Sequence, residues 1–317
     1  MLIVAFIVGL NVYRADKLTM QNNVNVAVFQ WRYFTTTQHN KHFSTESTDA
    51  NVILPTSFKS YNDSIYCKTM VLMKLRFPIC LYDPKLDRTI SAGLVAGKYW
   101  EENIVCSFVR LLRLDQRLHF VDIGANIGLH SLPAARITQV ISVEPNWFSM
   151  ARLAKGVYLG GAVSSNITLV HNAISNIRTT LRMGSGRTSQ GHAFLMNKTK
   201  CKGRCNALPL QTRTIILDDL LPLMQTDAAV LKVDVEGHED KVFTEPSAAQ
   251  FFNRIDVPLI FMEWNMVKRH SVDVRRLLSF FYNRSYTVFD LENAKLTKHY
   301  SKWPDNVLFK KLPLISF

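Results

Sequence analysis

The stretch LKVDVEGHED, residues 231–240, joins the end of an apolar strand pattern to a cluster of charged side chains. Apolar residues alternate in its first half, which predicts a strand, and the polar residues fall where that strand ends. In an open α/β sheet, ligands bind at the carboxyl ends of the strands, where charge is tolerated because the sheet opens into a cleft. The residues that we predict to act on a substrate follow two neighbouring strands: Asp234, Glu236, His238 and Glu263.

Carboxylates and an imidazole at such a place favour general acid–base chemistry. We expect His238 to be the base, because a position near a helix N-terminus disfavours the imidazolium form. We expect Asp234 and Glu236 to lie on one side, with the turn at Gly237 bringing the histidine over them. Glu263 would fix a substrate hydroxyl. Structural alternatives remain: His238 as a helix cap and Glu236 as a structural acid.

A second polar motif, FVDIGANIG at 120–128, predicts a cofactor loop. Asp122 ends a strand, and Gly124 and Gly128 bracket a tight turn whose backbone a ligand can approach closely. Residue 126 is asparagine, so the motif departs from the G-x-G-x-x-G pattern of dinucleotide sites. The nearby acid favours a ligand with hydroxyl or ammonium groups over a phosphate.

Glu144 ends the next predicted strand, 20 residues after Gly124. An acid at this place can accept hydrogen bonds from both ribose hydroxyls of a nucleoside. Asp-x-Gly-x-x-x-Gly followed by a strand-terminal Glu is the pattern of S-adenosylmethionine sites. The alternatives are a nicotinamide enzyme and an inactive relative.

Strand and helix patterns alternate from about residue 99 to residue 311, which predicts an α/β, Rossmann-like fold with a mostly parallel sheet. The last two strands have no helix between them, so we expect an antiparallel pair there. Pro133 falls inside the helix expected over 126–137 and should kink or shorten it. The basic stretch 177–213 interrupts the pattern and predicts a loop, either a lid or a surface excursion.

Six blocks occur in the order typical of FkbM-type methyltransferases: FVDIGANIG, VISVEPN, LVHNAISN, TRTIILDDLL, LKVDVEGHEDKVF and IFMEWN. The chain resembles this family over about residues 95–311. The resemblance implies a seven-stranded sheet with an antiparallel last strand, S-adenosylmethionine as cofactor, and O-methylation, often of sugar or polyketide hydroxyls. It places Asp234 at the methionine end of the cofactor or at the substrate, and Glu144 at the ribose. The other residues that it assigns to the cofactor are Asp122, Gly124, Ala125, Asn126 and Gly128 in the loop, and Asn172 and Ala173 beside the adenine.

The chain start predicts entry into the secretory pathway. Residues 1–14 resemble a signal or membrane anchor, although ten apolar residues fall short of the roughly 20 that a span needs. Residues 15–64 predict a polar, disordered stem, and 65–317 the methyltransferase domain. We expect a Golgi membrane location with an N-terminal tether, and a cytoplasmic one as the alternative. Glycosylation sequons and cysteines agree with the secretory pathway: Asn62, Asn166, Asn197, Asn283, and the candidate pairs Cys67 with Cys80 and Cys201 with Cys205.

The net charge of +13 permits an anionic partner, but the chain has no dense run of Arg and Lys. Methyltransferases that act on nucleobase amines usually carry an Asn/Asp-Pro-Pro-aromatic turn after the fourth strand, where this chain has DVEG. The absence of this turn and the charge pattern predict that the acceptor is no nucleic acid, and we expect no metal. The resemblance to the family implies a hydroxyl acceptor, and we expect that of a sugar or glycan. The alternative is an inactive protein of this fold that acts in membrane trafficking or protein interaction.

Overall fold

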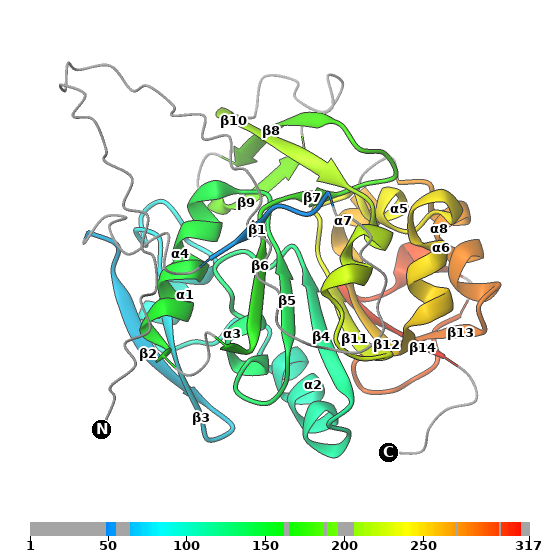
Figure 1. Cartoon of the computed structure of the whole chain (residues 1–317), viewed down its shortest axis with the longest axis horizontal. Helices are drawn as coiled ribbons and strands as arrows, with labels where there is room; N and C mark the ends of the chain where they lie inside the picture. The colour runs from blue at the N-terminus through cyan, green and yellow to red at the C-terminus, as the bar shows by residue number, and fades with distance from the viewer. Residues whose placement is uncertain are drawn as a thin grey trace, which may run out of the picture. The chain divides into compact units, whose positions relative to one another are not determined.

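The central element of the computed structural model is an eight-stranded sheet (Figure 1). The structure describes residues 49–54, 64–161, 165–186, 189–195, 206–269, 272–297 and 299–311, all within the unit Ser44–Phe317. Residues 1–14, most of the predicted stem, Asn62, Asn197, Cys201 and Cys205 lie outside the described residues.

The order of strands confirms the predicted fold class. In spatial order the strands are β1 (Val52–Ile53), β6 (Ile167–Val170), β5 (Val140–Val143), β4 (Leu118–Ile123), β11 (Ala228–Val233), β12 (Asp256–Glu263), β14 (Asn306–Lys311) and β13 (Tyr286–Phe289). From β6 to β12 all pairs are parallel, whereas β14 runs antiparallel to both β12 and β13. The chain order reverses between β4 and β11, which is the switch point where a ligand site is expected.

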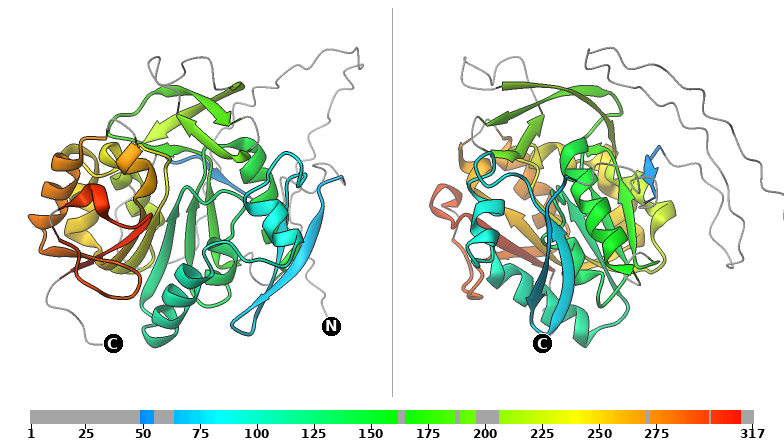
Figure 2. Two further views of the ribbon diagram at one scale, coloured as in Figure 1. Left: turned by 180° about the vertical axis from the view of Figure 1, so that it is seen from behind. Right: turned by 90° about the vertical axis from the view of Figure 1, so that its left-hand side faces the viewer.

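Two apolar layers cover the sheet (Figures 1 and 2). One face packs on α1 (Ile90–Val95), α2 (Glu102–Leu114), α3 (Ser131–Ala134) and α4 (Trp147–Leu159). The other packs on α5 (Glu239–Val242), α6 (Glu245–Arg254), α8 (Val274–Tyr282) and the 3-10 turn η3 (Leu217–Leu223). Even-numbered residues of β4 and β11, such as Phe120 and Val230, face the first layer, and odd-numbered ones, such as Val121 and Leu231, face the second. Alternation along a strand therefore decides which layer each polar residue meets.

Two expectations about local structure need correction, and one is confirmed. The sheet contains Val52 and Ile53, which pair antiparallel with β6, so the folded domain includes residues that we assigned to the stem. The helix expected over 126–137 is shortened to the four residues of α3, which is the outcome that we predicted from Pro133. The helix expected over 238–252 is divided into α5 and α6.

The stretch 177–213 is also not a simple loop. It contains β8 (Thr180–Gly186), β9 (Ser189–Leu195) and most of β10 (Asn206–Ile215), which form a second sheet with β7 (Ala173–Ile174) in the order β7-β10-β8-β9. The pairings β10–β8 and β8–β9 are antiparallel, so composition alone did not separate these strands from a loop. Since β7 follows closely after β6, this sheet begins at the carboxyl end of the main sheet, and its use as a lid stays a prediction.

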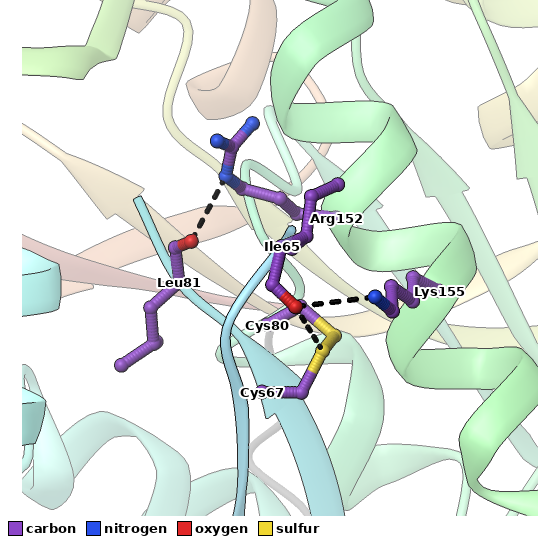
Figure 3. Close-up of a disulfide and its surroundings, with 6 residues drawn as sticks. All are labelled: Ile65, Cys67, Cys80, Leu81, Arg152 and Lys155. Atoms are coloured by element: carbon purple, nitrogen blue, oxygen red, sulfur yellow. Dashed lines mark hydrogen bonds between the residues drawn. A yellow bond between two sulfur atoms is a disulfide. The ribbon is translucent and has the colours of Figure 1, made fainter. Parts of the chain in front are cut away.

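A hairpin precedes the alternating region. It consists of β2 (Cys67–Leu72) and β3 (Leu75–Cys80), and a disulfide joins its two outer residues, Cys67 and Cys80 (Figure 3). The structure thus confirms the candidate pair Cys67–Cys80, whereas Cys201 and Cys205 lie outside the described residues. Cys106 is a half-buried free thiol in α2.

Candidate active site

The loop after β4 is locked to the end of β11 by the backbone. Gly124 has φ +87°, and a Cβ atom there would lie 1.8 Å from the carbonyl oxygen of Asp234. The Asp234 N–H donates to the carbonyl of Ile123 over 2.9 Å, while the N–H of Gly124 donates to the carbonyl of Val143. Glycine is therefore required both by its backbone conformation and by the close approach of two strand ends. The closest neighbour of this glycine is the protein's own backbone, and the turn sits at the switch point.

Glu144 holds the same loop from the neighbouring strand. One carboxylate oxygen accepts from the N–H of Asn126 and the other from the N–H of Asn146, each over 2.7 Å. Asn126 has a left-handed backbone, with φ +49°. Burial raises the pKa of Glu144 to about 7, and the nearby Asp122 and Asp234 add to this, while the two backbone hydrogen bonds act in the opposite direction. Each carboxylate oxygen keeps a second lone pair that a ligand hydroxyl can use.

Asp122 is fully buried beneath this loop. Its Oδ2 accepts from Ser131 Oγ over 2.6 Å, and Ser142 Oγ in turn donates to that serine over 2.7 Å. Among the described residues, its other oxygen, Oδ1, has no hydrogen-bond partner. A buried carboxylate oxygen without a partner is costly, so this atom favours a ligand that donates a hydrogen bond or carries positive charge.

Lys232 and Asp234 continue the polar region across β11. Lys232 lies in register with Asp122, and its Nζ contacts Asp234 Oδ2 at 3.0 Å. Burial would lower the pKa of Lys232, but Asp234, Asp122 and Glu101 together raise it, so the side chain stays charged. Lys232 is thus a buried, charged partner of the Asp234 carboxylate.

Glu263 ends β12 on the same face of the sheet. Its Oε2 has no hydrogen-bond partner among the described residues. Burial raises the pKa of this carboxyl to about 10, and Asp234, Glu236 and Glu239 add to the effect. At neutral pH Glu263 is therefore protonated and can donate a hydrogen bond. The structure brings Asp234, Glu236 and Glu263 into one electrostatic cluster, as predicted.

The placement of His238 over Asp234 and Glu236 stays a prediction. The strand β11 ends at Val233, and Glu236 has a left-handed backbone with φ +56°, so the strand alternation that we expected to carry Asp234 and Glu236 to one side stops before them. Nε2 of His238 lies 2.9 Å from Ser175 Oγ, just after β7. The residue occupies the N-cap position of α5 but its side chain makes no capping hydrogen bond, so the capping alternative is wrong. Because α5 has four residues, its dipole is also a weak reason for a neutral ring.

The residues expected beside an adenine lie at the start of the second sheet. Asn172 is fully buried: its Oδ1 accepts from the N–H of Asn51 over 2.7 Å, and its Nδ2 donates to the carbonyl of Arg213 over 3.2 Å. Ala173 is buried at the first position of β7. Asn172 therefore joins β1 and β10 to the main sheet, and an adenine contact for either residue stays a prediction.

Sequence reasoning missed a contact between a carboxyl group and a histidine near Lys232. Glu101, with φ +53° before α2, contacts Nε2 of His130 at 3.2 Å and accepts from Nδ2 of Asn306 over 2.9 Å. Despite burial, His130 lowers the pKa of Glu101 to about 2, with Lys232 acting in the same direction. Glu101, His130 and Asn306 come from three distant segments, so no local motif could have revealed their contacts. A further missed acid is Glu239, which is fully buried and whose pKa burial raises to about 8.

A parallel sheet that reverses order at β4, a glycine turn there and an acid at the end of β5 fit an S-adenosylmethionine-dependent methyltransferase. The methyltransferase FkbM domain matches residues 122–288, more than half of the chain. The chain belongs to the FkbM methyltransferase family, and its cofactor is S-adenosylmethionine.

Solved structures of similar fold include several methyltransferases. The methyltransferase FkbM from Methylobacillus flagellatus is 16% identical with a TM-score of 0.39, over 61% of this chain and 43% of that one. A putative O-methyltransferase from Klebsiella pneumoniae is 17% identical with a TM-score of 0.40, over 73% and 91%. The Bacillus cereus O-methyltransferase in complex with SAH is 11% identical with a TM-score of 0.37, over 72% and 90%. No curated protein sequence matches the chain.

The residues at the site fit this cofactor. It brings a sulfonium centre, an ammonium group and two ribose hydroxyls, and it supplies the methyl group as an electrophile when bound. Asp122, Glu144 and Asp234 offer carboxylates for the positive groups and hydroxyls, and Asp122 Oδ1 has no protein partner among the described residues. We expect Glu144 to hold the ribose and the loop backbone to lie against the nucleoside.

Proposed function

We propose that the protein transfers a methyl group from S-adenosylmethionine to a hydroxyl oxygen of a sugar or glycan. The observation that carries this proposal is the carboxyl cluster at the ends of β11 and β12. Asp234 and Glu236 can accept hydrogen bonds from neighbouring hydroxyls, whereas Glu263 is protonated and has an oxygen without a protein partner among the described residues. A polyhydroxylated acceptor offers both donors and acceptors to such a mixed set.

His238 remains our candidate for the base that takes the hydroxyl proton. Two of the acids are poorer candidates for this base. A raised pKa keeps Glu263 protonated at neutral pH, and the charge of Asp234 is compensated by Lys232. Ser175 orients the imidazole, because Nε2 of His238 lies within hydrogen-bond distance of its hydroxyl. Such a base contributes about 10²–10⁴ in rate, while alignment of the two reactants supplies the larger share of the acceleration.

A location in the secretory pathway is part of the proposal. The disulfide between Cys67 and Cys80 is typical of proteins that fold in an oxidising compartment. Asn283, in one of the four sequons, is exposed at the end of α8. No helix in the described part of the chain is long and apolar enough to cross a bilayer, so the proposed tether depends on residues 1–14.

The proposal is tested by product analysis. The full chain, purified from a secretory host, is incubated with methyl-labelled S-adenosylmethionine and a panel of neutral and acidic glycans. We expect label in an alkali-stable methyl ether, with turnover reduced about 10²–10⁴-fold in His238→Ala and unchanged in the exposed control His299→Ala. Alkali-labile label would indicate a carboxyl acceptor, and label on amines would contradict O-methylation.

A function without catalysis is the second candidate. If the protein has no catalytic function, the chain should fold but fail to bind S-adenosylmethionine. Our proposal requires that it binds this cofactor. The intact contacts among Gly124, Asn126, Glu144 and Asp234 favour the catalytic alternative.

A further inference from the structure

The disulfide hairpin β2–β3 lies before the matched family residues and packs on α4. Two basic residues of α4 hold its two ends: Nζ of Lys155 donates to the carbonyl of Ile65, and Nε of Arg152 donates to the carbonyl of Leu81, each over 3.1 Å (Figure 3). The disulfide closes the hairpin between these two anchors. These contacts therefore fix the position of the next residue, Tyr82, beside the N-terminal turns of α4.

Tyr82 is almost completely buried at 3% exposure. The guanidinium of Arg152 lies 3.7 Å above its ring. Its hydroxyl oxygen lies 2.8 Å from Ser149 Oγ and 3.4 Å from Asn146 Nδ2. Burial raises the pKa of Tyr82, so the phenol keeps its proton and acts as a donor throughout the neutral range.

The directions of these hydrogen bonds lead to the cofactor loop. Ser149 has one hydroxyl proton, which it donates to Asn126 Oδ1 over 3.1 Å. Tyr82 must then donate to Ser149, and its oxygen accepts from Asn146. This relay of hydrogen bonds from Tyr82 through Ser149 therefore fixes the side chain of Asn126. Asn126 is the residue with a left-handed backbone whose N–H donates to Glu144.

We propose that Tyr82 is a positioning residue for S-adenosylmethionine: through Ser149 it holds Asn126, and through Asn126 it orients the carboxylate of Glu144. The proposal concerns the cofactor site and is independent of the acceptor. Loss of the phenol hydroxyl removes one hydrogen bond from Ser149 and one from Asn146 in a buried network. The loop that contains Asn126 should therefore become more mobile even where the ring packing is kept.

The first test is Tyr82→Phe, which keeps the ring beneath Arg152. The matched control is Tyr66→Phe, an exposed tyrosine of the same hairpin segment. By calorimetry on the full chain, we expect S-adenosylmethionine to bind roughly fivefold to thirtyfold more weakly to Tyr82→Phe and unchanged to the control. Ser149→Ala should give a similar loss, and the double variant little more than either one, because both interrupt one relay.

Two further readouts separate positioning from packing. In the cofactor-free protein, amide hydrogen exchange at Asn126 should be severalfold faster in Tyr82→Phe than in the control. The pH midpoint of cofactor binding, which we assign to Glu144 facing Asp122 and Asp234, should move upward because the carboxylate loses support from Asn126. A lower melting temperature with unchanged affinity, exchange and pH midpoint would overturn the proposal and leave Tyr82 as a packing residue.

Discussion

Replacing Gly124 by alanine tests the contact between the cofactor loop and β11. The added Cβ atom would lie 1.8 Å from the Asp234 carbonyl oxygen and 2.9 Å from its carbon, and both are backbone atoms. They cannot move aside without separating the ends of β4 and β11, which the hydrogen bond from Asp234 N–H to Ile123 joins. The φ of +87° adds a conformational penalty.

The expected magnitude is the sum of these two effects. A left-handed backbone costs an L-residue about 1–2 kcal/mol, and forcing an extra carbon into a packed site costs about 1–3 kcal/mol. Gly124→Ala should therefore lower the free energy of unfolding by about 2–5 kcal/mol, measured by urea titration. Gly97→Ala is the matched control, because Gly97 has φ +79° and nothing within 4 Å of its added Cβ.

The difference between the two variants isolates the steric contact. We also expect Gly124→Ala to weaken cofactor binding, because Asp234 and the loop must shift together, while Gly97→Ala should bind normally. If Gly124→Ala destabilises the protein no more than Gly97→Ala does, the close approach at the switch point is refuted.

Three other predictions concern pH, the disulfide and glycosylation. Burial raises the pKa of Glu239 from 4.5 to about 8, so its contribution to stability is full below its unfolded pKa and is lost as the pH rises through about 8. Glu239 should lower the free energy of unfolding by up to about 1.4 kcal/mol per pH unit between about pH 4.5 and 8, and Glu239→Gln should remove this part of the slope; a flat wild-type profile would contradict this. Reducing the bond between Cys67 and Cys80, 13 residues apart, should cost about 3 kcal/mol of stability, and unchanged urea midpoints would argue against the bond. In a secretory host, mass spectrometry should find a glycan on exposed Asn283 and none on Asn166, whose amide atoms are both hydrogen-bonded; the reverse pattern would count against the structure.

Much of the cofactor site could be predicted because its determinants are local. Asp122, Gly124 and Glu144 each come at the end of an apolar strand pattern, and parallel strands bring their carboxyl ends together. The cluster of Asp234 and Glu263 follows from the same rule. The fold class and the antiparallel pair at the end of the sheet were predictable too, since alternating strands and helices allow few topologies.

What escaped prediction depends on contacts between distant segments. Tyr82 reaches Asn126 through Ser149, and Glu101 meets His130, without any shared motif. The strand alternation that we expected through Glu236 ends earlier, because the chain leaves the strand at Val233 and turns through a left-handed residue. Composition also misled us in the stretch 177–213, where strand pairing outweighed glycine, serine and lysine content.

Calorimetric titration of S-adenosylmethionine into the full chain tests the central claim most directly. We predict binding of one cofactor per chain, weakened about tenfold or more in Glu144→Gln, because an amide cannot offer two charged acceptors to the ribose. Absence of binding to the wild-type chain, or equal affinity in Glu144→Gln, would contradict the account of this site.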